Sequence, residues 1–374
     1  MPERILVVDD EPAMLRGVER VLASAYRVAT ARTPAEALER ARGFAPDLAV
    51  IDIRMPEMDG FELSAELREA QPGLDVIFMT GAVHELNAQL IRSIREKAFY
   101  FIQKPFDREV LLTLVERCLE VRRLAAQNRT HLARLESELQ QARQFQQSLL
   151  PPPEARLAGA SIATAYEPCD ELGGDLVDYV EVDEGRLAAL VADVSGHGVS
   201  AAMLTAVVKA AFHDAHVEEY APGAVVRRVL GGLRTFADDR FVTLFCARFE
   251  AARGRLEYVN AGHPPALLFG RRGAPRAIAR TGPMVTPAFP GLEWGAETLE
   301  LGPGERLLAY TDGVTEARGA DGELFGDARL LAAARAAGGS ARELVAGVRA
   351  AVRAFTAGRP MDDDLTLFAL SVEA

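Results

Sequence analysis

The sequence contains little cysteine, little lysine and no long apolar run. Its three cysteines are an odd number, lie far apart and form no CxxC pair, which argues against a disulfide framework and a zinc knuckle. The formal net charge is −12, and no basic stripe is available for a phosphate backbone, which disfavours nucleic acid and anionic membranes. The first apolar run, in "MPERILVVDDE", is broken by acids, and no later one is long enough to cross a bilayer. We therefore expect a cytoplasmic protein with no nucleic-acid or membrane partner.

Length and sequence texture divide the chain into three parts. At 374 residues it is too long for one comfortable core and suits two domains with a connecting segment. We expect a first domain over residues 1–122, a helical connector over residues 123–153 and a second domain over residues 154–374.

Short apolar runs alternate with helical segments through the first domain. The runs "RILVV", "LAVID", "DVIFMT" and "YFIQK" each end at, or just before, polar residues: Asp9 and Asp10, Asp52, Thr80 and Lys104. This alternation predicts an α/β domain, a parallel sheet with helices on both faces. Ligands bind beyond the carboxyl ends of such strands, so we expect these side chains to converge there.

The chemistry of this set favours a cation and a phosphoryl group. Carboxylates that lie close together repel one another, so a hard cation such as Mg²⁺ is their natural partner. Lys104 is one of only three lysines in the chain, and its ammonium can approach a phosphoryl oxygen as a point charge. The alternative, solvated charges at loop starts, suits any one of these residues but not the set.

The strings "VVDDE", "VIDIRMPEMDG", "MTG" and "FIQKPF" resemble the receiver domain of two-component response regulators over roughly residues 3–122. The resemblance implies a flavodoxin-like, doubly wound fold that accepts a phosphoryl group from a phosphohistidine on a partner sensor histidine kinase. It also assigns roles by motif: Asp52 as phosphoacceptor, Asp9, Asp10, Asp52 and the carbonyl of Arg54 as the Mg²⁺ site, Lys104 as the partner of the phosphoryl group, and Thr80 and Phe101 as the switch pair. One departure is "EKAFYF", where Lys97 stands in place of the usual glycine.

Apolar residues fall into heptads from Leu111 onward. They occupy two positions, which together we call the seam: Leu111, Cys118, Ala125, Leu132 and Leu139 on one, and Leu114, Val121, Leu135, Ala142 and Leu149 on the other. The pattern predicts a parallel two-stranded coiled coil and hence a homodimer. Asn128 and Gln146 interrupt the seam, which weakens it but can fix its register. The alternative is one amphipathic helix packed on its own domain.

Past Pro153, glycine-punctuated strands replace the helical pattern. Four strings each place an aspartate in a glycine-rich or acidic turn: "ELGGDLVDYV", "ADVSGHG", "AYTDGVTE" and "DDDLTLFAL". A serine, histidine and aspartate triad in "DVSGHG" is disfavoured, because triads draw on separate elements and the string lacks GxSxG. A simple turn explains one Asp-Gly pair but not four aspartates. Oxygen ligands without a histidine and cysteine set indicate magnesium or manganese, and a pair of such ions can activate water for attack on phosphorus.

These strings, with "FVTLFC", "YVNAGHPP" and "ARQFQQSLLP", resemble the PPM (type 2C) serine/threonine phosphatases of the bacterial sporulation and stress-response branch, over roughly residues 155–374. The resemblance implies an α+β fold, with two antiparallel sheets flanked by helices and two Mn²⁺ or Mg²⁺ ions. By motif, Asp193 bridges both ions and the carbonyl of Val194 completes one shell. Asp312 and Asp363 hold the other ion, and Asp175 is reached directly or through water.

Other polar residues around these motifs are weaker candidates. Asp178 and Asp364 are expected beside the ligands rather than among them. Animal members of the family use a histidine two places after the bridging aspartate as a proton donor, but here Ser195 holds that place and His197 follows two positions later. Ser195 and His197 are therefore catalytic candidates, with a structural loop role for His197 equally open. For His263 a structural role is favoured, and no arginine is assigned as a phosphate clamp.

The two resemblances predict a response regulator whose output is dephosphorylation of another protein. The branch indicates a phosphoserine or phosphothreonine on an anti-sigma-factor antagonist as substrate. A non-catalytic, phosphatase-like adaptor is the alternative, but such adaptors lose the acidic ligands that this chain keeps. A DNA-binding regulator would need a helix-turn-helix and a basic face, and neither is apparent. Whether phosphorylation of Asp52 activates or inhibits the output stays open.

Overall fold

Two structural units share the chain, residues 1–135 and residues 136–374, and each is described by itself. The computed structural model describes residues 2–81, 100–196, 198–236, 240–270, 274–289 and 291–373. In these parts of the chain no helix is both long enough and apolar enough to cross a membrane. The domain boundaries expected near residues 122 and 153 stay a prediction.

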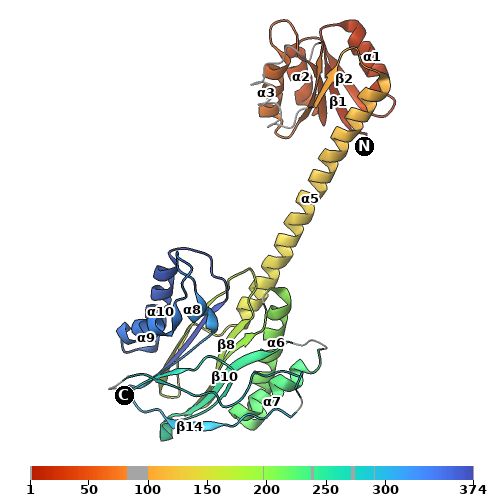
Figure 1. Cartoon of the computed structure of the whole chain (residues 1–374). Coiled ribbons are helices and arrows are strands. Elements are labelled where there is room, and N and C mark those ends of the chain that lie inside the picture. Colours follow the sequence, from red (N-terminus) through yellow and green to blue (C-terminus); the bar gives the residue numbers. More distant parts are fainter. Residues whose placement is uncertain are drawn as a thin grey trace. The chain divides into compact units, whose positions relative to one another are not determined.

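The first unit is an α/β layer structure, as predicted. Its strands all run parallel, in the order β2-β1-β3-β4-β5. They are β1 (Arg4–Val8), β2 (Arg27–Ala31), β3 (Leu48–Asp52), β4 (Asp75–Thr80) and β5 (Tyr100–Gln103). Helix α1 (Pro12–Leu22) and the first part of α5 (Arg108–Leu149) cover one face, while α2 (Pro34–Phe44) and α3 (Gly60–Ala70) cover the other (Figure 1). This double cover explains why the central strands are apolar along their whole length.

Helix α5 contains the predicted seam, and its two parts lie in different surroundings. Leu111 and Cys118 are buried in the core of the first unit, so the first heptads pack against their own domain. Val121, Leu132 and Leu135 are more than half exposed. The start of the seam therefore packs on its own domain, as the single-helix alternative states. For the exposed residues from Val121 onward, the coiled coil stays a prediction.

The second unit contains two antiparallel sheets. The order of the first is β14-β11-β10-β9-β8, and the order of the second is β13-β12-β15-β16-β7-β6. The first comprises β8 (Asp175–Asp183), β9 (Arg186–Val194), β10 (Val242–Glu250), β11 (Arg255–Ala261) and β14 (Glu297–Glu300). The second comprises β6 (Glu154–Leu157), β7 (Ala160–Glu167), β12 (Leu267–Phe269), β13 (Arg276–Ala277), β15 (Arg306–Tyr310) and β16 (Leu365–Val372).

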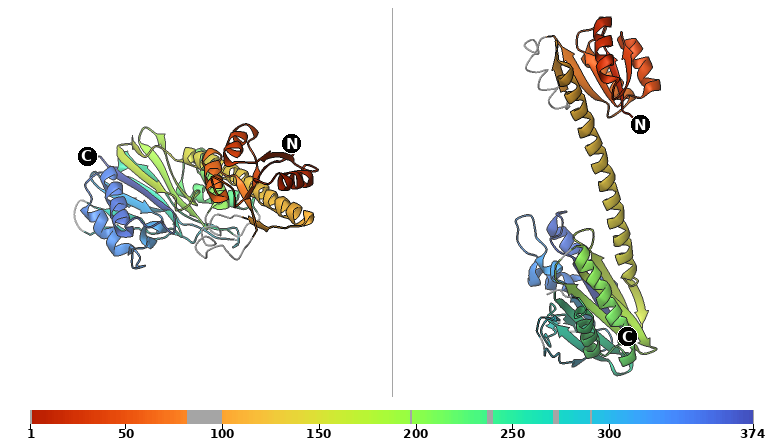
Figure 2. Two further views of the ribbon diagram at one scale, coloured as in Figure 1. Left: turned by 90° about the horizontal axis from the view of Figure 1, so that it is seen from above. Right: turned by 90° about the vertical axis from the view of Figure 1, so that its right-hand side faces the viewer.

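Helices cover the outer faces of both sheets. The α-helices are α6 (Val199–Asp214), α7 (Pro222–Leu233), α8 (Asp312–Glu316), α9 (Gly326–Ala336) and α10 (Ala341–Thr356), and the short 3₁₀ turns are η2 (Ala215–Glu218) and η3 (Ala251–Arg253). Val191, Phe245 and Phe368 belong to the core between the sheets. The outer faces pack against α6 and α7 on one side and against α8, α9 and α10 on the other (Figures 1 and 2). The predicted two-sheet architecture flanked by helices is confirmed.

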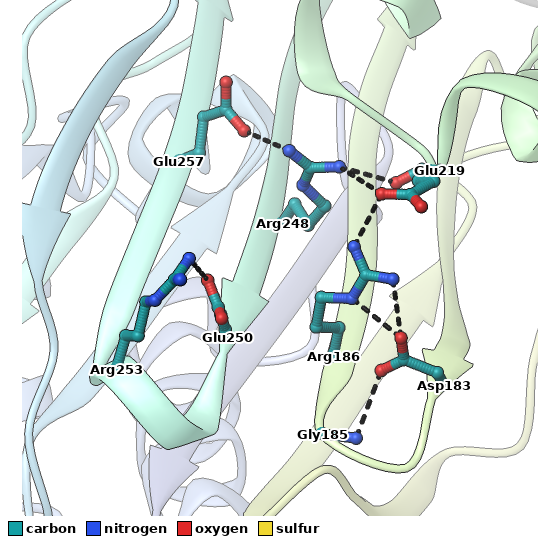
Figure 3. Close-up of polar contacts among 8 residues, drawn as sticks. All are labelled: Asp183, Gly185, Arg186, Glu219, Arg248, Glu250, Arg253 and Glu257. Atoms are coloured by element: carbon teal, nitrogen blue, oxygen red, sulfur yellow. Dashed lines mark hydrogen bonds and ion pairs between the residues drawn. The ribbon is translucent and has the colours of Figure 1, made fainter.

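An ion-pair network holds the turn that joins β8 to β9 (Figure 3). Arg186 lies 2.6 Å from Asp183 and 2.6 Å from Glu219. Arg248 lies 2.7 Å from Glu257 and donates a hydrogen bond of 3.0 Å to the backbone carbonyl of Glu219. Each exposed pair contributes little stability by itself. Together they tie the closed end of the β8–β9 hairpin to the segment after α6, and the other end of the same hairpin carries the candidate site.

Candidate metal centres

In the first unit, four of the predicted polar residues meet at the carboxyl ends of the strands. Asp9 follows β1, and Asp52 ends β3. Carboxylate oxygens of Asp9, Asp10 and Asp52 lie within 4.8 Å of one another. The Nζ atom of Lys104 lies 2.7 Å from Asp9 and 2.9 Å from Asp52. This cluster of oxygen donors fits Mg²⁺, whose ligands are carboxylates and water.

Electrostatics at this cluster reflect burial opposed by the lysine. Burial raises the pKa of Asp52, and the hydrogen bond from Lys104 partly counteracts that rise. Burial also acts against the charge of Lys104, but its bonds to Asp9 and Asp52 outweigh this and raise its pKa. Asp52 and Lys104 thus act on each other electrostatically, and the charge of a phosphoryl group bound at this cluster would act on both.

The other candidates of the first unit are Arg54, Thr80 and Phe101, which lie on or just after strands β3, β4 and β5. The backbone N–H of Arg54 donates to the Asp52 carboxylate, and the metal role of the Arg54 carbonyl stays a prediction. Thr80 is the buried last residue of β4, and the ring of Phe101 on β5 stacks on Phe78 with centroids 5.5 Å apart. The switch role of Thr80 and Phe101 also stays a prediction. Lys97 lies outside the described residues.

In the second unit, Asp175 and Asp193 face each other across the open end of the β8–β9 hairpin. They are register partners, and Asp175 is almost fully buried. One oxygen of Asp175 accepts hydrogen bonds from the hydroxyls of Thr311 (2.7 Å) and Thr366 (2.6 Å). Because Thr311 and Thr366 belong to the second sheet and its adjoining turn, Asp175 joins the two sheets at this end.

The second sheet brings two further carboxylates to the same place. Asp312 begins α8 directly after β15, and Asp363 precedes β16, which pairs with β15. A side chain at Gly313 would collide with the carbonyl of Asp364, so glycine is needed where these two turns touch. Charge on Asp312 and Asp363 acts directly on Asp193. Asp193 thus has Asp175 as its register partner and Asp312 and Asp363 as charged neighbours, and the role of the four as metal ligands stays a prediction.

Asp364 holds the glycine turn that precedes Asp175. Its carboxylate accepts backbone N–H groups from Cys169 (2.9 Å), Gly174 (2.6 Å) and Asp175 (3.3 Å). A side chain at Gly174 would lie 2.7 Å from the carbonyl of Val194, so only glycine allows this approach. Asp364 thus supports the neighbours of the predicted ligands, in the position expected for it.

Three further candidates have different surroundings. Asp178 lies three residues after Asp175, and the alternation of β8 turns its side chain to the α6 face, where it bonds to Lys209 (2.5 Å) and His213 (2.8 Å). This position corrects the expectation that Asp178 lies beside the metal ligands. Ser195 accepts a hydrogen bond from the backbone N–H of Phe241 (3.0 Å), which closes the end of the ladder with β10. His197 lies outside the described residues.

The charge balance of this second cluster calls for cations. Burial, with repulsion from Asp193 and Asp364, raises the pKa of Asp175 well above its ordinary value. Burial, with repulsion from Asp312, Asp363 and Asp364, raises the pKa of Asp193 to about 7. Hard oxygen donors that repel one another fit Mg²⁺ or Mn²⁺. The Cys169 sulfur also lies here, within 4.8 Å of carboxylate oxygens of Asp363 and Asp364.

We expect the metal-free protein to lose stability as pH rises. The carboxyl of Asp193 keeps its proton to about pH 7 in the folded state but loses it near pH 4 when unfolded, so stability falls between these values. Thermal unfolding with a chelator should therefore occur at a lower temperature at pH 7.5 than at pH 5. Excess Mn²⁺ should reduce or reverse that difference. A chelated protein that becomes more stable across this range would contradict the assignment.

Several contacts at the site involve residues that the motifs did not single out. The pairing of strands brings three threonine hydroxyls to the carboxylates: those of Thr311 and Thr366 bond to Asp175, and that of Thr243 bonds to Asp193. Gln146 on α5 is buried, donates to the carbonyl of Gly173 (2.6 Å) and accepts from its N–H (3.2 Å). The threonines lie inside the quoted strings "AYTDGVTE", "DDDLTLFAL" and "FVTLFC", and Gln146 interrupts the seam, but none of these signals indicated the contact that each side chain makes.

Two family models match the chain, one within each structural unit. The response regulator receiver domain matches residues 5–116, and stage II sporulation protein E (SpoIIE) matches residues 183–373. The chain belongs to the SpoIIE family. The receiver domain at its N-terminal side is confirmed as well.

Relatives of this SpoIIE-family chain are similar over parts of their length. It is 28% identical to protein IcfG of Synechocystis sp. over 62% of the chain and 41% of the relative. It is 33% identical to phosphoserine phosphatase RsbP of Bacillus subtilis over 48% of the chain and 45% of the relative. The chain thus spans less than half the length of either protein.

Two solved structures are similar to the second unit in fold. The SiaA-PP2C domain of Pseudomonas aeruginosa has a TM-score of 0.57 at 20% identity, over 65% of this chain and 98% of that one. The RsbU and RsbW domains of Rv1364c from Mycobacterium tuberculosis have a TM-score of 0.51 at 27% identity, over 58% of this chain and 61% of that one. The first likeness concerns the fold alone.

Proposed function

We propose that this chain is a response regulator whose output is metal-dependent hydrolysis of phosphoserine or phosphothreonine on a partner protein. The observation that carries the proposal is the convergence of Asp175, Asp193, Asp312 and Asp363 at one end of the two sheets. The similarity to a phosphoserine phosphatase supports the same chemistry. Two divalent ions held there would supply an activated water for attack on phosphorus.

The protein's own residues prepare this site. Thr311 and Thr366 fix one oxygen of Asp175, which leaves its other oxygen free to face the cluster. Asp364 holds the backbone on either side of the glycine turn. These hydrogen bonds hold Asp175 and its turn at fixed positions, which favours their action as metal ligands.

The substrate we propose is a phosphorylated anti-sigma-factor antagonist. With a net charge of −12, the chain has no long-range attraction for a phosphoprotein, so the ions must supply the local positive field and docking must depend on surface shape. Mn²⁺-dependent release of phosphate from a phosphoserine peptide tests the activity. An adaptor that only binds its partner would release none.

We further propose that the receiver controls this activity after phosphorylation of Asp52 by a sensor histidine kinase, and that α5 pairs with its copy in a homodimer. The exposed seam residues Leu132 and Leu135 support pairing, because large apolar side chains rarely stay solvated along a helix. Gln146, at the end of α5, supports coupling because it contacts the turn that leads to Asp175.

We expect beryllofluoride or acetyl phosphate to change the phosphatase rate of the wild type and to leave Asp52→Ala unaffected. Coupling between two sites is typically worth ~5- to 150-fold. Phosphate release should be measured for both proteins, with and without the phosphoryl analogue, at one Mn²⁺ concentration. Equal rates in treated wild type and Asp52→Ala would remove receiver control and leave the phosphatase assignment intact.

A further inference from the structure

His263 is a fully buried histidine that the proposed ligand set does not use. Its loop is fixed from several sides: the Asn260 side chain accepts the backbone N–H of His263 (2.9 Å), and Arg280 donates to the backbone carbonyl of His263 (3.1 Å). The imidazole Nδ1 lies 2.9 Å from the hydroxyl of Thr243. The contact with Thr243 leads from this ring toward the candidate metal site.

Thr243 connects His263 to Asp193. It lies on β10 directly opposite Asp193 in the ladder, and its hydroxyl hydrogen-bonds to the Asp193 carboxylate. An ionised carboxylate can only accept, and a hydroxyl has one hydrogen, so Thr243 donates to Asp193. The hydroxyl oxygen then accepts from Nδ1–H of His263. These directions apply to the ionised carboxylate of Asp193 and to the tautomer of His263 that carries its proton on Nδ1.

The ring has two candidate acceptors for its proton, the Thr243 hydroxyl at Nδ1 and the backbone carbonyl of Tyr310. Burial, with repulsion from Arg280, lowers the pKa of His263 to about 3 although the backbone carbonyl of Tyr310 opposes this fall. The imidazole is therefore neutral and carries a single proton. Its Nε2 atom is buried and has no hydrogen-bond partner among the residues that the structure describes.

We propose that His263 and Thr243 are positioning residues that hold the Asp193 carboxylate ready to bind a divalent cation. The inference rests on the proposed function, in which Asp193 is the ligand shared by both ions. A carboxylate that receives a hydrogen bond on a fixed side keeps one rotamer, and such supporting bonds tune metal affinity. His263 acts only through Thr243, so it touches neither ion nor substrate.

The first test compares Thr243→Val with Thr243→Ser. Valine matches threonine in shape but lacks the hydroxyl, whereas serine keeps it. We expect Thr243→Val to weaken Mn²⁺ binding by ~10- to 100-fold and Thr243→Ser by less than about threefold. Free Mn²⁺ can be followed by its electron paramagnetic resonance signal, alongside the Mn²⁺ concentration that gives half-maximal phosphate release. Wild-type affinity in folded Thr243→Val would overturn the proposal.

The second test compares His263→Asn with His263→Gln. The amide nitrogen of asparagine takes the place of Nδ1, and that of glutamine takes the place of Nε2. We expect His263→Asn to keep Mn²⁺ affinity within about threefold and His263→Gln to lose ~10- to 100-fold. The reverse order would mean that the ring acts through the Tyr310 carbonyl, which would overturn the proposal.

A third measurement separates this inference from the proposed function. Mn²⁺ binding by the full-length chain does not require a substrate, so the four variants can be ranked even if the wild type hydrolyses no phosphoserine peptide. A purely structural role would lower the unfolding temperature of Thr243→Val without changing Mn²⁺ affinity, and this result would also overturn the proposal.

Discussion

Replacing Asp193 with asparagine should reduce Mn²⁺-dependent phosphate release by more than ~10²-fold. Asp193 is the proposed ligand of both ions, so its loss should have a larger effect than the loss of Thr243, which only supports it. The same change should stabilise the metal-free protein at pH 7.5. Burial and three neighbouring carboxylates raise the pKa of Asp193 to about 7, so its charge is a cost to the folded state above that pH. Asparagine keeps the shape and removes the charge. Activity and metal-free stability should thus change in opposite directions.

The matched control for this variant is Glu181→Gln. Glu181 is an exposed carboxylate on β8 of the same hairpin, and its replacement removes the same charge away from the cluster. Phosphate release with Mn²⁺ and thermal unfolding with a chelator should be measured for both variants. Unchanged activity in Asp193→Asn would rule out the site assignment. A loss of metal-free stability would rule out the repulsion that we infer.

Gln146→Leu should reduce phosphate release by about 10²-fold, through displacement of the turn that leads to Asp175. The side chain of Gln146 satisfies both the N–H and the carbonyl of Gly173, and Tyr166 donates to the same glutamine oxygen. Leucine would leave two buried backbone groups unpaired, at a cost of ~1–3 kcal/mol each. The turn must move to find other partners, and Asp175 moves with it.

Gln147→Leu provides the control, because Gln147 is the exposed neighbour on the same helix. Initial rates over a range of Mn²⁺ concentrations should show a loss for Gln146→Leu that excess Mn²⁺ only partly restores. Comparable rates for the two variants would mean that the end of α5 does not support the metal site.

Each predicted ligand stands at a strand end or in a turn with glycine, and local sequence is enough to locate such positions. Asp193 lies next to the last residue of β9, and Asp312 follows β15. Asp175 begins β8, and Asp363 lies just before β16. Gly174 and Gly313 have the matching signature, since each sits where another backbone passes too closely for a side chain.

Local sequence says less about residues whose role depends on a partner distant in sequence. Asp178 and Asp175 both lie in "ELGGDLVDYV", but a spacing of three places them on opposite faces of one strand. The hydroxyls of Thr311 and Thr366 acquire a role only when β15 and β16 lie beside β8. The early seam residues Leu111 and Cys118 suit both a coiled coil and a domain core, and periodicity alone does not separate the two.

Asp363 and Asp364 are adjacent, but the fold uses them for different purposes. Asp363 is a proposed ion ligand whose charge acts on Asp193, and Asp364 holds the backbone of the neighbouring turn. A descendant that loses only the first would keep its shape and become a pseudoenzyme, still able to present the same surface to a partner. A descendant that loses only the second would forfeit the architecture itself. Catalysis in this lineage can therefore be lost by one substitution without loss of the folded protein.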